Sequence, residues 1–414
     1  MMQQSDNISE LIGNRLPTEM QEILVIAGKV AKEQGYKLYM VGGMVRDLLL
    51  GRPSLDLDLT VEGDAVDIAH RFAKAVQGKV TVHTRFRTAT VKWEGKGVDF
   101  ATARSENYSR PGALPAVEAG DIKTDLSRRD FTINSLAVDI SSGELLDPYN
   151  GSKDIEKRLI RILHEKSFID DATRIWRAIR YEQRLSFTLE PDTLKLVKRD
   201  LYMLDTISRD RIRHELELVL KEEYPEKAIH RADELGILKK LHPSLAGDDW
   251  ISETFRKARE VISPNSPSIE LYLTLLTFRL IEDETEEFIS RLGLGKLQTQ
   301  TLRDACLLKS RLSKLFESGI KPSEIYYLLH DLSHTALTAV SIAADSPAVN
   351  KNINLYLNKL RHVRSALTGK DLEKMGIKPG PYMKEILGKL LEARLDGQVT
   401  DKQDEIETVG KVDR

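Results

Sequence analysis

The sequence is poor in the features that mark secreted, metal-clustered or membrane proteins. Among its 414 residues there is one cysteine, Cys306, which excludes an internal disulfide framework and a zinc site built from cysteines. No apolar run approaches the ~20 residues that a membrane-spanning helix needs, and the N-terminus lacks the pattern of a signal peptide. We therefore expect a cytoplasmic protein in a reducing setting, with no membrane partner.

Charge of either sign is not in excess. Lysine and arginine total 62, aspartate and glutamate total 64, and the formal net charge is −2. This balance argues against a uniformly basic nucleic-acid binder, so any contact with RNA must come from a local patch. A content of 41% hydrophobic and 30% charged residues is typical of a globular protein, and 414 residues exceed what one core normally serves. At least two domains are expected.

The pattern of apolar residues changes along the chain. Helical spacing is found over 19–34 and 64–76, whereas strand-like alternation dominates from residue 37 to about 146. The expected strands are 37–41, 55–60, 79–83, 88–93, 97–100 and 135–140, and 105–121 is expected to be a long loop. Beyond Pro148 nearly every long segment has helical spacing, and strand-like alternation disappears. The predicted fold class is α+β, with a small mixed β-sheet head followed by an all-α remainder.

The segment that follows the first expected strand is typical of a phosphate site. Gly42 and Gly43 stand between that strand and a helix expected over 45–50, whose free N-terminal amides and dipole favour bound phosphate. A glycine pair alone is most often only a tight turn.

The next strand carries two carboxylates. Period-two alternation puts Asp56 and Asp58 on one face and three leucines on the other. Carboxylate pairs suit Mg²⁺, which prefers oxygen ligands and keeps positions for water and substrate phosphate. Alternating Asp and Leu is also typical of a half-exposed strand, but the order strand, Gly-Gly, helix, acidic strand favours a site for phosphoryl or nucleotidyl transfer.

A further motif, Asp-Leu-Ser-Arg-Arg-Asp-Phe-Thr-Ile-Asn-Ser-Leu-Ala, occupies 125–137. Together with the glycine pair and the carboxylate pair, it resembles the class II tRNA nucleotidyltransferase and bacterial poly(A) polymerase family, within the DNA polymerase β-like superfamily. The resemblance covers five ordered signatures from Val41 to about Leu220 and continues more weakly over 369–381. It implies an N-terminal polar segment and helix (1–35), a catalytic nucleotidyltransferase head (36–150), a helical base-recognition neck (151–225), a helical body (226–330) and a helical, tRNA-binding tail (331–414).

By this resemblance, the first signature binds a nucleoside triphosphate and two Mg²⁺ ions. The catalytic metal ligands would be Asp56 and Asp58, and the nucleotide would contact Gly42, Gly43 and Arg46. Superfamily members commonly add a third carboxylate from a neighbouring strand, and Asp99 is the candidate metal ligand here. The alternative for Asp99 is a solvent-facing strand residue.

The second signature resembles the residues that recognise ribose and orient the nucleotide in this family, namely Arg128, Arg129, Asp130 and Asn134. A carboxylate or amide paired with a 2′-hydroxyl favours NTP over dNTP, since the deoxy analogue leaves that group unpaired. The alternative from the residues alone is a capped helix with two surface arginines.

The fourth signature resembles the family's amino-acid template for the base. On a helix, Asp171 and Arg174 would share a face. The carboxylate can accept from the exocyclic amine of cytosine or adenine while the guanidinium donates to the ring, so CTP and ATP pass and UTP and GTP do not. Arg177 and Arg180 continue near this face and are assigned to the triphosphate. A helix-surface ion pair is the alternative.

Two fainter signatures complete the set. The third, over 146–154, matches the family at Asp147 and Gly151, which would form a flexible joint between head and neck, although ordinary turn chemistry explains the pattern equally well. The fifth, over 207–216, resembles the start of a neck helix with Ser208 as N-cap. We interpret it as support of the neck, without a part in catalysis.

The predicted function is Mg²⁺-dependent addition of C and A to the tRNA 3′ end (CCA addition or repair) without a nucleic-acid template, with the tRNA 3′ end, ATP and CTP as partners. Within the family, an A-adding-only enzyme, a CC-adding-only enzyme and a poly(A) polymerase remain alternatives. The near full-length segment 105–121 counts against CC-only addition. A non-catalytic RNA-binding protein is the alternative from another class. The residues predict no particular oligomeric state.

Overall fold

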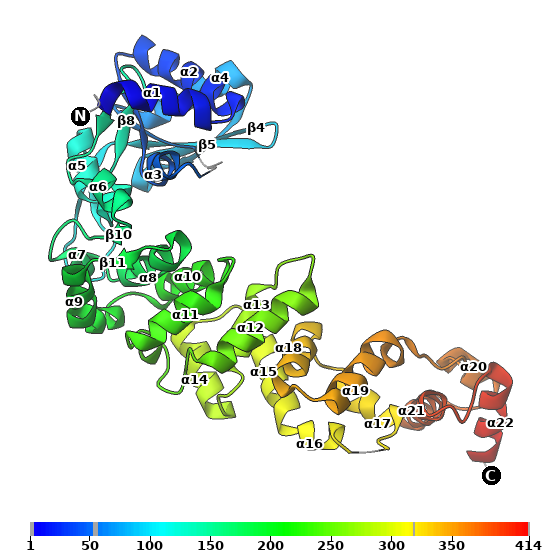
Figure 1. The fold of residues 1–414 in the computed structure, drawn as a ribbon. Helices are drawn as coiled ribbons and strands as arrows, with labels where there is room; N and C mark the ends of the chain where they lie inside the picture. The colour runs from blue at the N-terminus through cyan, green and yellow to red at the C-terminus, as the bar shows by residue number, and fades with distance from the viewer. Residues whose placement is uncertain (1–3, 53–56, 318, 413–414) are drawn as a thin grey trace. The chain divides into compact units, whose positions relative to one another are not determined.

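The computed structural model describes residues 4–52, 57–317 and 319–412. They form two compact units, Met1–Leu216 with Leu235–Lys240, and Glu217–Glu234 with Leu241–Arg414. The first unit contains a mixed sheet with helices around it, and the second is helical in its described residues (Figure 1). This confirms the predicted α+β class. The domain boundaries after residues 35, 150, 225 and 330 stay predictions.

The main sheet of the first unit has the strand order β3-β4-β5-β2-β1-β8-β9. Its strands are β1 (Lys37–Val41), β2 (Leu57–Glu62), β3 (Lys79–His83), β4 (Thr88–Trp93), β5 (Lys96–Thr102), β8 (Ala137–Asp139) and β9 (Leu145–Leu146). The β2–β5 pair is parallel and the other pairs are antiparallel, so the sheet is mixed as predicted. This order puts β2, which carries Asp58, between β5 and β1 near the centre of the sheet.

Helices α2 (Thr18–Glu33) and α4 (Ala65–Val76) pack against the sheet. The spacing of apolar residues predicted both, and Asp64 caps α4 by accepting from the backbone N–H of Val66 and Asp67. Phe72 of α4 is fully buried and contacts the rings of Phe100 and Trp93 at centroid distances of 5.3 and 5.5 Å. This packing supports the face of the sheet away from exposed Asp58.

Helix α3 (Gly43–Leu50) follows β1 directly, as predicted from the glycine pair. Helix α1 (Gln4–Arg15) was not predicted, because its sequence is polar and carries few apolar residues at helical spacing. It packs against α3, and Arg15 NH1 donates to Leu48 O at 2.8 Å near the α3 C-terminus.

The predicted long loop over 105–121 is wrong in part, because it contains a β-hairpin. Strands β6 (Arg104–Asn107) and β7 (Ala116–Ala119) pair antiparallel around a tip that holds the Pro-Gly-Ala-Leu-Pro run. Their short polar strands show no alternation that sequence could reveal. At the tip, Gly112 has φ +72°, and a Cβ there would lie 2.5 Å from the carbonyl oxygen of Thr206. Glycine therefore lets the hairpin tip touch the chain that precedes α10 (Arg209–Leu220).

The rest of the first unit is mostly helical. It contains η1 (Thr84–Phe86), α5 (Ile122–Ser127), η2 (Thr132–Asn134), α6 (Gly151–Glu156), α7 (Ser167–Asp170), α8 (Thr173–Leu185), α9 (Pro191–Asp200), η3 (Leu201–Asp205) and η4 (Leu238–Lys240). Two short strands, β10 (Leu159–Ile160) and β11 (Thr188–Leu189), pair in parallel, so the expectation that strands end before Pro148 was wrong. Two-residue strands are too short to show a period. The strand expected over 135–140 is shorter, because the Ser135 hydroxyl bonds Leu126 O before β8 begins.

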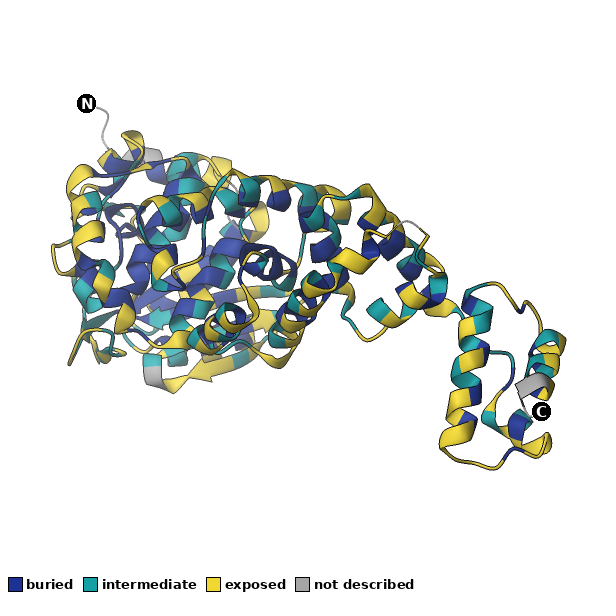
Figure 2. Cartoon of the chain, turned by 90° about the horizontal axis from the view of Figure 1, so that it is seen from below, coloured by how far each residue is buried: buried dark blue, intermediate teal, exposed yellow. Residues whose placement is uncertain are grey.

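The described part of the second unit consists of helices. They are α11 (Pro225–Glu234), α12 (Asp249–Ile262), α13 (Ile269–Thr277), α14 (Glu282–Leu292), α15 (Lys296–Ser310), α16 (Leu312–Leu315), α17 (Pro322–Leu329), α18 (His334–Ala344), α19 (Pro347–Asn358), η5 (Leu360–His362), α20 (Gly369–Lys374), α21 (Pro381–Leu395) and α22 (Lys402–Val412). One apolar cluster includes Leu308, Leu337 and Ile353, and another includes Leu372 and Ile386. Figure 2 shows the buried positions alternating with exposed ones along these helices. Among the described helices, none has the length and apolar character needed to cross a bilayer.

Candidate functional site

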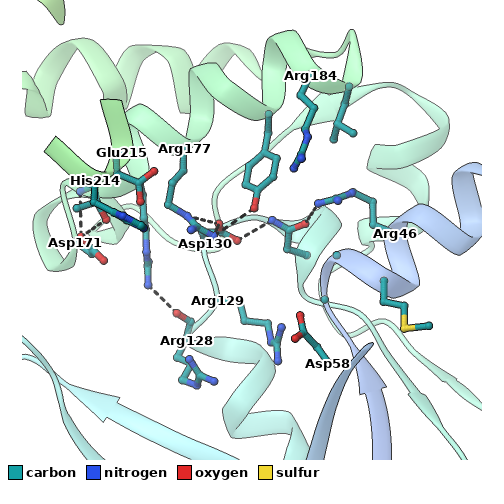
Figure 3. Close-up of a pocket in the computed structure, with 18 of the residues that line it drawn as sticks. Arg46, Asp58, Arg128, Arg129, Asp130, Asp171, Arg177, Arg184, His214 and Glu215 are labelled. Carbon is teal, nitrogen blue, oxygen red and sulfur yellow. Dashed lines mark hydrogen bonds and ion pairs between the residues drawn. The ribbon is translucent and has the colours of Figure 1, made fainter. Parts of the chain in front are cut away.

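A pocket of about 910 Å³ opens in the first unit, between the N-terminus of α3, the strand β2, the α5–η2 segment and helices α8 and α10. Its lining is dominated by arginine and carboxylate side chains (Figure 3). Residues predicted from the sequence meet here from segments more than 100 residues apart. Those that line the pocket are Gly42, Gly43, Arg46, Asp58, Arg128, Arg129, Asp130, Asn134, Asp171, Arg174 and Arg177, and Asp99 is the strand partner of Asp58.

Gly42 forms the turn between β1 and α3. Its φ is +67°, and a Cβ at this position would lie 2.6 Å from NH1 of Arg129. The positive φ therefore favours glycine here, and a larger residue would also have to displace the Arg129 guanidinium. Arg46, one turn into α3, is buried and donates from NH1 to Asn134 Oδ1 at 2.5 Å, while its Nε pairs with Asp47 at 2.9 Å. The glycine turn thus holds two arginines at one end of the pocket.

The acidic strand presents Asp58 to solvent while Leu57 and Leu59 are buried. In the parallel β2–β5 pair, Asp58 is the direct partner of Asp99, so both side chains leave the same face of the sheet. Asp99 accepts from the Thr90 hydroxyl and lines a neighbouring pocket that it shares with Asp58. Asp56 lies outside the described residues.

These carboxylates fit Mg²⁺ by their chemistry. Within the described ranges, no cluster of three or more His, Cys, Asp or Glu side chains is arranged as a metal site. Asp58 and Asp99 nonetheless supply oxygen donors on adjacent strands, and Asp56 stands two residues before Asp58. An oxygen-only set suits a hard cation such as Mg²⁺. The metal ligands Asp56, Asp58 and Asp99 stay predictions.

Arg128 and Arg129 are held by one buried carboxylate, Asp125 of α5. It accepts from Arg128 NH2 at 2.6 Å and from Arg129 NH2 at 2.8 Å. Burial alone would raise the pKa of Asp125, but the two guanidiniums outweigh it and lower that pKa. Glu106 of β6 also accepts from Arg128, at 2.9 Å. Both arginine side chains are mostly buried, so the alternative of two surface arginines was wrong.

A second chain of polar contacts crosses the middle of the pocket. Asp130 accepts from Asn134 Nδ2 at 3.0 Å and from Arg177 NH2 at 2.5 Å. Burial would raise the pKa of Asp130, but Arg177 and the Asn134 amide lower it to about 2. The pKa of Arg177 is raised, chiefly by Asp130. The guanidiniums of Arg46 and Arg177 lie 5.3 and 5.6 Å from the ring centroid of Tyr181, within the range of cation–π attraction.

Asp171 and Arg174 meet in the pocket, but the predicted shared helix face was wrong. Asp171 is extended, with φ −143° and ψ 98°, between α7 and α8, whereas Arg174 lies in the first turn of α8. Asp171 Oδ1 accepts from the Thr173 N–H at 3.0 Å, which makes a tight turn before the helix. Aspartate commonly stands just before a helix and bonds its first free N–H groups, and the sequence does not distinguish this position from one inside the helix.

Arg174 is buried and is held by neutral groups. Its NH1 donates to Ser167 Oγ and its NH2 to Arg128 O, each at 2.7 Å. In the described residues no ion pair joins Arg174 to Asp171, so the alternative of a helix-surface ion pair was wrong. Arg174 keeps its net positive charge in the pocket, beside the Asp171 carboxylate.

Arg180 lines no part of this pocket. Its guanidinium lies 5.1 Å from the Tyr181 ring centroid and its NH2 is 3.9 Å from Glu215 Oε2. The predicted contact of Arg180 with the triphosphate stays a prediction.

Several pocket residues were not predicted. Helix α10 contributes Arg211, His214 and Glu215, although its segment was interpreted only as support of the neck. Their i, i+3, i+4 spacing places them on one helix face, a signal that the sequence did contain. Glu215 is 6% exposed, and burial raises its pKa despite Arg177 nearby. The other unpredicted lining side chains include Arg52, Glu106, Tyr108, Tyr181 and Arg184.

The pocket therefore has three chemically distinct parts. Asp58 stands at one end (Figure 3), and the Gly42 turn also lines the pocket. Asp130, bonded to Asn134, stands in the middle and Asp171 at the other end (Figure 3), and Arg174, three residues along the chain from Asp171, lines the same pocket. An acceptor and a donor side by side match the amino edge of a base.

Comparisons with known proteins agree with this geometry. Residues 38–161 match the poly(A) polymerase head domain, and 186–248 match the probable RNA and SrmB-binding site of polymerase A. The A-adding tRNA nucleotidyltransferase of Halalkalibacterium halodurans is 31% identical, over 97% of this chain and 95% of that protein. The A-adding tRNA nucleotidyltransferase of Geobacter sulfurreducens is 35% identical over 96% of this chain, which spans about half (48%) of that relative's length.

A solved structure extends the likeness to the fold. The structure of a CCA-adding enzyme with ATP superposes with a TM-score of 0.81 at 29% identity, covering 98% of this chain and 99% of that one. The sequence signatures, the sheet topology and the pocket all lie within the matched region. The chain therefore belongs to the tRNA nucleotidyltransferase family of enzymes, with a poly(A) polymerase-type head domain.

Proposed function

We propose that this chain adds C and A residues to the 3′ end of tRNA, without a nucleic-acid template, using CTP and ATP with Mg²⁺. The observation that carries the proposal is the placement of Asp171 and Arg174 in the same pocket as Asp58. One end of the pocket can hold the reacting phosphate while the other examines the base.

The base is selected by hydrogen-bond polarity. Asp171 can accept from the exocyclic amine of cytosine or adenine, and Arg174 can donate to the adjacent ring acceptor. Uracil and guanine present a carbonyl where the amine stands, which sets an acceptor against the Asp171 carboxylate. Two acceptors facing each other inside the pocket cannot bond and lose the water that each could bind, so UTP and GTP are disfavoured.

The sugar and phosphates are handled by groups that are already fixed. Asn134 donates one N–H to Asp130 and accepts from Arg46, which leaves a second N–H for a ribose hydroxyl. Arg104, Arg128 and Arg129 share two carboxylates, Asp125 and Glu106, so the group keeps a net positive charge for the triphosphate. Fixed donors of this kind stabilise charge without rearranging during the reaction.

Asp58, with Asp56 and Asp99, would hold Mg²⁺. When bound, the metal lowers the pKa of the attacking 3′-hydroxyl and neutralises charge on the leaving pyrophosphate. Asp58 is exposed on the pocket side of the sheet, where its carboxylate can face both the RNA end and the triphosphate.

The proposal is tested with tRNA transcripts that end before CCA, after C, after CC and after CCA, each offered labelled ATP or CTP. We expect CTP to be used on the first two and ATP on the third, with no extension of the complete end. Long adenylate tails on every transcript would identify a poly(A) polymerase instead and would refute the proposal.

Addition of A alone is a second candidate, favoured by the two relatives at 31% and 35% identity, both named A-adding enzymes. In that case only the transcript ending in CC accepts a nucleotide, and that nucleotide is ATP. Cytosine and adenine both present an amine to Asp171, so the pocket alone does not separate the two candidates. The same four transcripts do separate them.

Replacing Asp58 tests the metal end of the pocket. We expect Asp58→Ala to lower kcat by about a thousandfold or more, because lost charge stabilisation of a few kcal/mol has this effect, while tRNA affinity stays within about twofold. The matched control is Asp67→Ala, which removes an exposed aspartate of α4 that pairs with Arg71. Equal turnover by Asp58→Ala and the parent would reject the assignment of Asp58 to the metal site.

A further inference from the structure

The two oxygens of the Asp171 carboxylate differ in the number of hydrogen bonds that they accept. Its Oδ1 accepts three hydrogen bonds, from the Thr173 N–H at 3.0 Å, the Thr173 hydroxyl at 2.7 Å and Arg211 NH2 at 2.7 Å. Its Oδ2 accepts none from any residue that the structure describes. A carboxylate oxygen has roughly two lone-pair positions, so Oδ1 is saturated and Oδ2 keeps its full capacity for another donor.

Arg211 is the only charged partner of Asp171 among the described residues. The two Thr173 donors belong to the turn next to Asp171, whereas Arg211 comes from α10, 40 residues further along the chain. Its NH1 also points to Gly112 O of the β6–β7 tip, at 3.5 Å. The guanidinium thus contacts two segments distant in sequence and adds a third donor to the Asp171 oxygen that the Thr173 turn already bonds.

The two arginines beside Asp171 differ in what they leave available. Arg174 donates to neutral oxygens and makes no ion pair with Asp171, so its charge stays available to a ligand. Arg211 donates to the carboxylate itself at ion-pair distance. A charge-assisted hydrogen bond is about twice as strong as a neutral one, and the planar guanidinium fixes direction as well as distance.

We propose, building on the nucleotide selection described above, that Arg211 is a positioning residue that fixes Asp171 so that Oδ2 faces the amino edge of the incoming base. Without Arg211, the carboxylate rotates about its Cβ–Cγ bond and accepts solvent, and the discrimination between an amine and a carbonyl weakens. Arg211 acts through Asp171 and does not itself contact the base.

A double-mutant cycle tests this directly. Arg211→Gln, Asp171→Ala and the double variant are compared with the parent, and kcat/KM is measured for ATP and GTP on tRNA ending in CC. We expect Arg211→Gln to reduce the ATP-to-GTP ratio by about 10- to 100-fold, the range for losing a hydrogen bond to a charged group. In the Asp171→Ala background the same substitution should change the ratio by less than about twofold.

Conservative variants exclude a merely structural effect. Arg211→Lys keeps the charge but loses the planar fork, so its ratio should lie between those of the parent and Arg211→Gln. Thr173→Val removes one donor to Oδ1 and should give a smaller loss than Arg211→Gln. The matched control is Arg213→Gln on the same helix, since Arg213 pairs with Asp210 at 2.8 Å and does not line the pocket. If Arg211→Gln does not fold, Arg211→Lys and Thr173→Val carry the test.

An ATP-to-GTP ratio in Arg211→Gln equal to that of the parent would overturn the inference. The inference would also fail if Arg211→Gln changed the ratio equally in the parent and in the Asp171→Ala variant, because Arg211 would then act on the nucleotide itself. Equilibrium binding of ATP and GTP without tRNA is measured in parallel. If the parent binds ATP selectively but transfers nothing to tRNA, the proposed function fails. The loss of binding selectivity in Arg211→Gln would still support the role of Arg211.

Discussion

At the residue scale, Asp130 is the side chain on which the middle of the pocket depends. It joins Asn134 to Arg177, and through Asn134 it fixes Arg46. Its pKa of about 2 lies below the ~3.9 of an unfolded aspartate, so its ionised form favours the folded state. The stability it contributes is fully present above pH ~4 and is lost as the pH falls towards 2.

Asp130→Asn should therefore destabilise the protein by about 2–3 kcal/mol at pH 7, because Arg177 loses its buried anionic partner. Urea unfolding at pH 7 and pH 2.5 provides the measurement, and the difference between variant and parent should shrink at the lower pH. Asp192→Asn serves as the control, because Asp192 is exposed and pairs with exposed Lys195. A difference of the same size at both pH values would contradict the account.

The structure brings together the predicted site residues of motifs that are continuous in sequence, while their roles stay predictions. The glycine turn, the second signature and the Asp171–Arg174 pair were all placed in one pocket by the structure. The shared helix face of Arg211, His214 and Glu215 could be predicted from their spacing, but the contacts of Arg211 and Glu106 with residues 40 and 22 positions away could not. Asp56 lies outside the described residues, so its role stays a prediction.

At the element scale, the turn between β9 and α6 shows how local chemistry fixes the end of the head. Asp147 accepts from the Gly151 N–H at 2.6 Å and from the Ser152 N–H at 3.0 Å, which caps α6. A Cβ on Gly151 would lie 2.2 Å from Thr132 O, a backbone atom that cannot move away alone. The hydrogen bonds explain Asp147 and the close approach explains Gly151. A flexible joint here stays a prediction.

Gly151→Ala should lower the free energy of unfolding by about 3 kcal/mol, because the added methyl group must displace the η2 backbone. Gly388→Ala is the matched control. Gly388 lies inside α21 with open space around its Cβ position, so alanine there should stabilise by about 0.5–1 kcal/mol. Denaturant unfolding of both variants gives the comparison, and equal effects of the two substitutions would argue against a steric role for Gly151.

Elements in which apolar residues recur regularly over at least five residues were predicted well, and short or polar elements were not. Helices α2 and α4 and strands β1, β3 and β4 agree with the expected ranges within one or two residues. The hairpin β6–β7 and the pair β10–β11 were missed because their strands are too short or too polar to show alternation. Helix α1 was missed because its packing on α3, rather than its own pattern, makes it helical.

At the scale of the whole molecule, a net charge of −2 means that RNA phosphates must be bound by local groups of lysine and arginine. RNA binding and base selection then depend on different interactions. Phosphate contacts by local lysines and arginines depend steeply on salt, whereas the Asp171–Arg174 reading depends on short hydrogen bonds inside a pocket. Strand order was not predicted from sequence, since the central place of β2 depends on long-range pairing with β1 and β5.

Raising the salt concentration from 50 to 200 mM should therefore weaken tRNA binding by more than about tenfold. The ratio of kcat/KM for ATP over GTP should change by less than about twofold over the same range. Filter binding and single-nucleotide kinetics measure the two quantities. A selectivity that falls in parallel with tRNA affinity would contradict base reading by enclosed hydrogen bonds.

The most direct measurement is a crystal structure of the chain with Mg²⁺ and a non-hydrolysable ATP analogue. The account predicts the triphosphate at the Gly42 turn beside Asp58, and the adenine amine within about 3 Å of Asp171 Oδ2. A nucleotide bound outside this pocket, or an adenine whose amine faces away from Asp171, would contradict it.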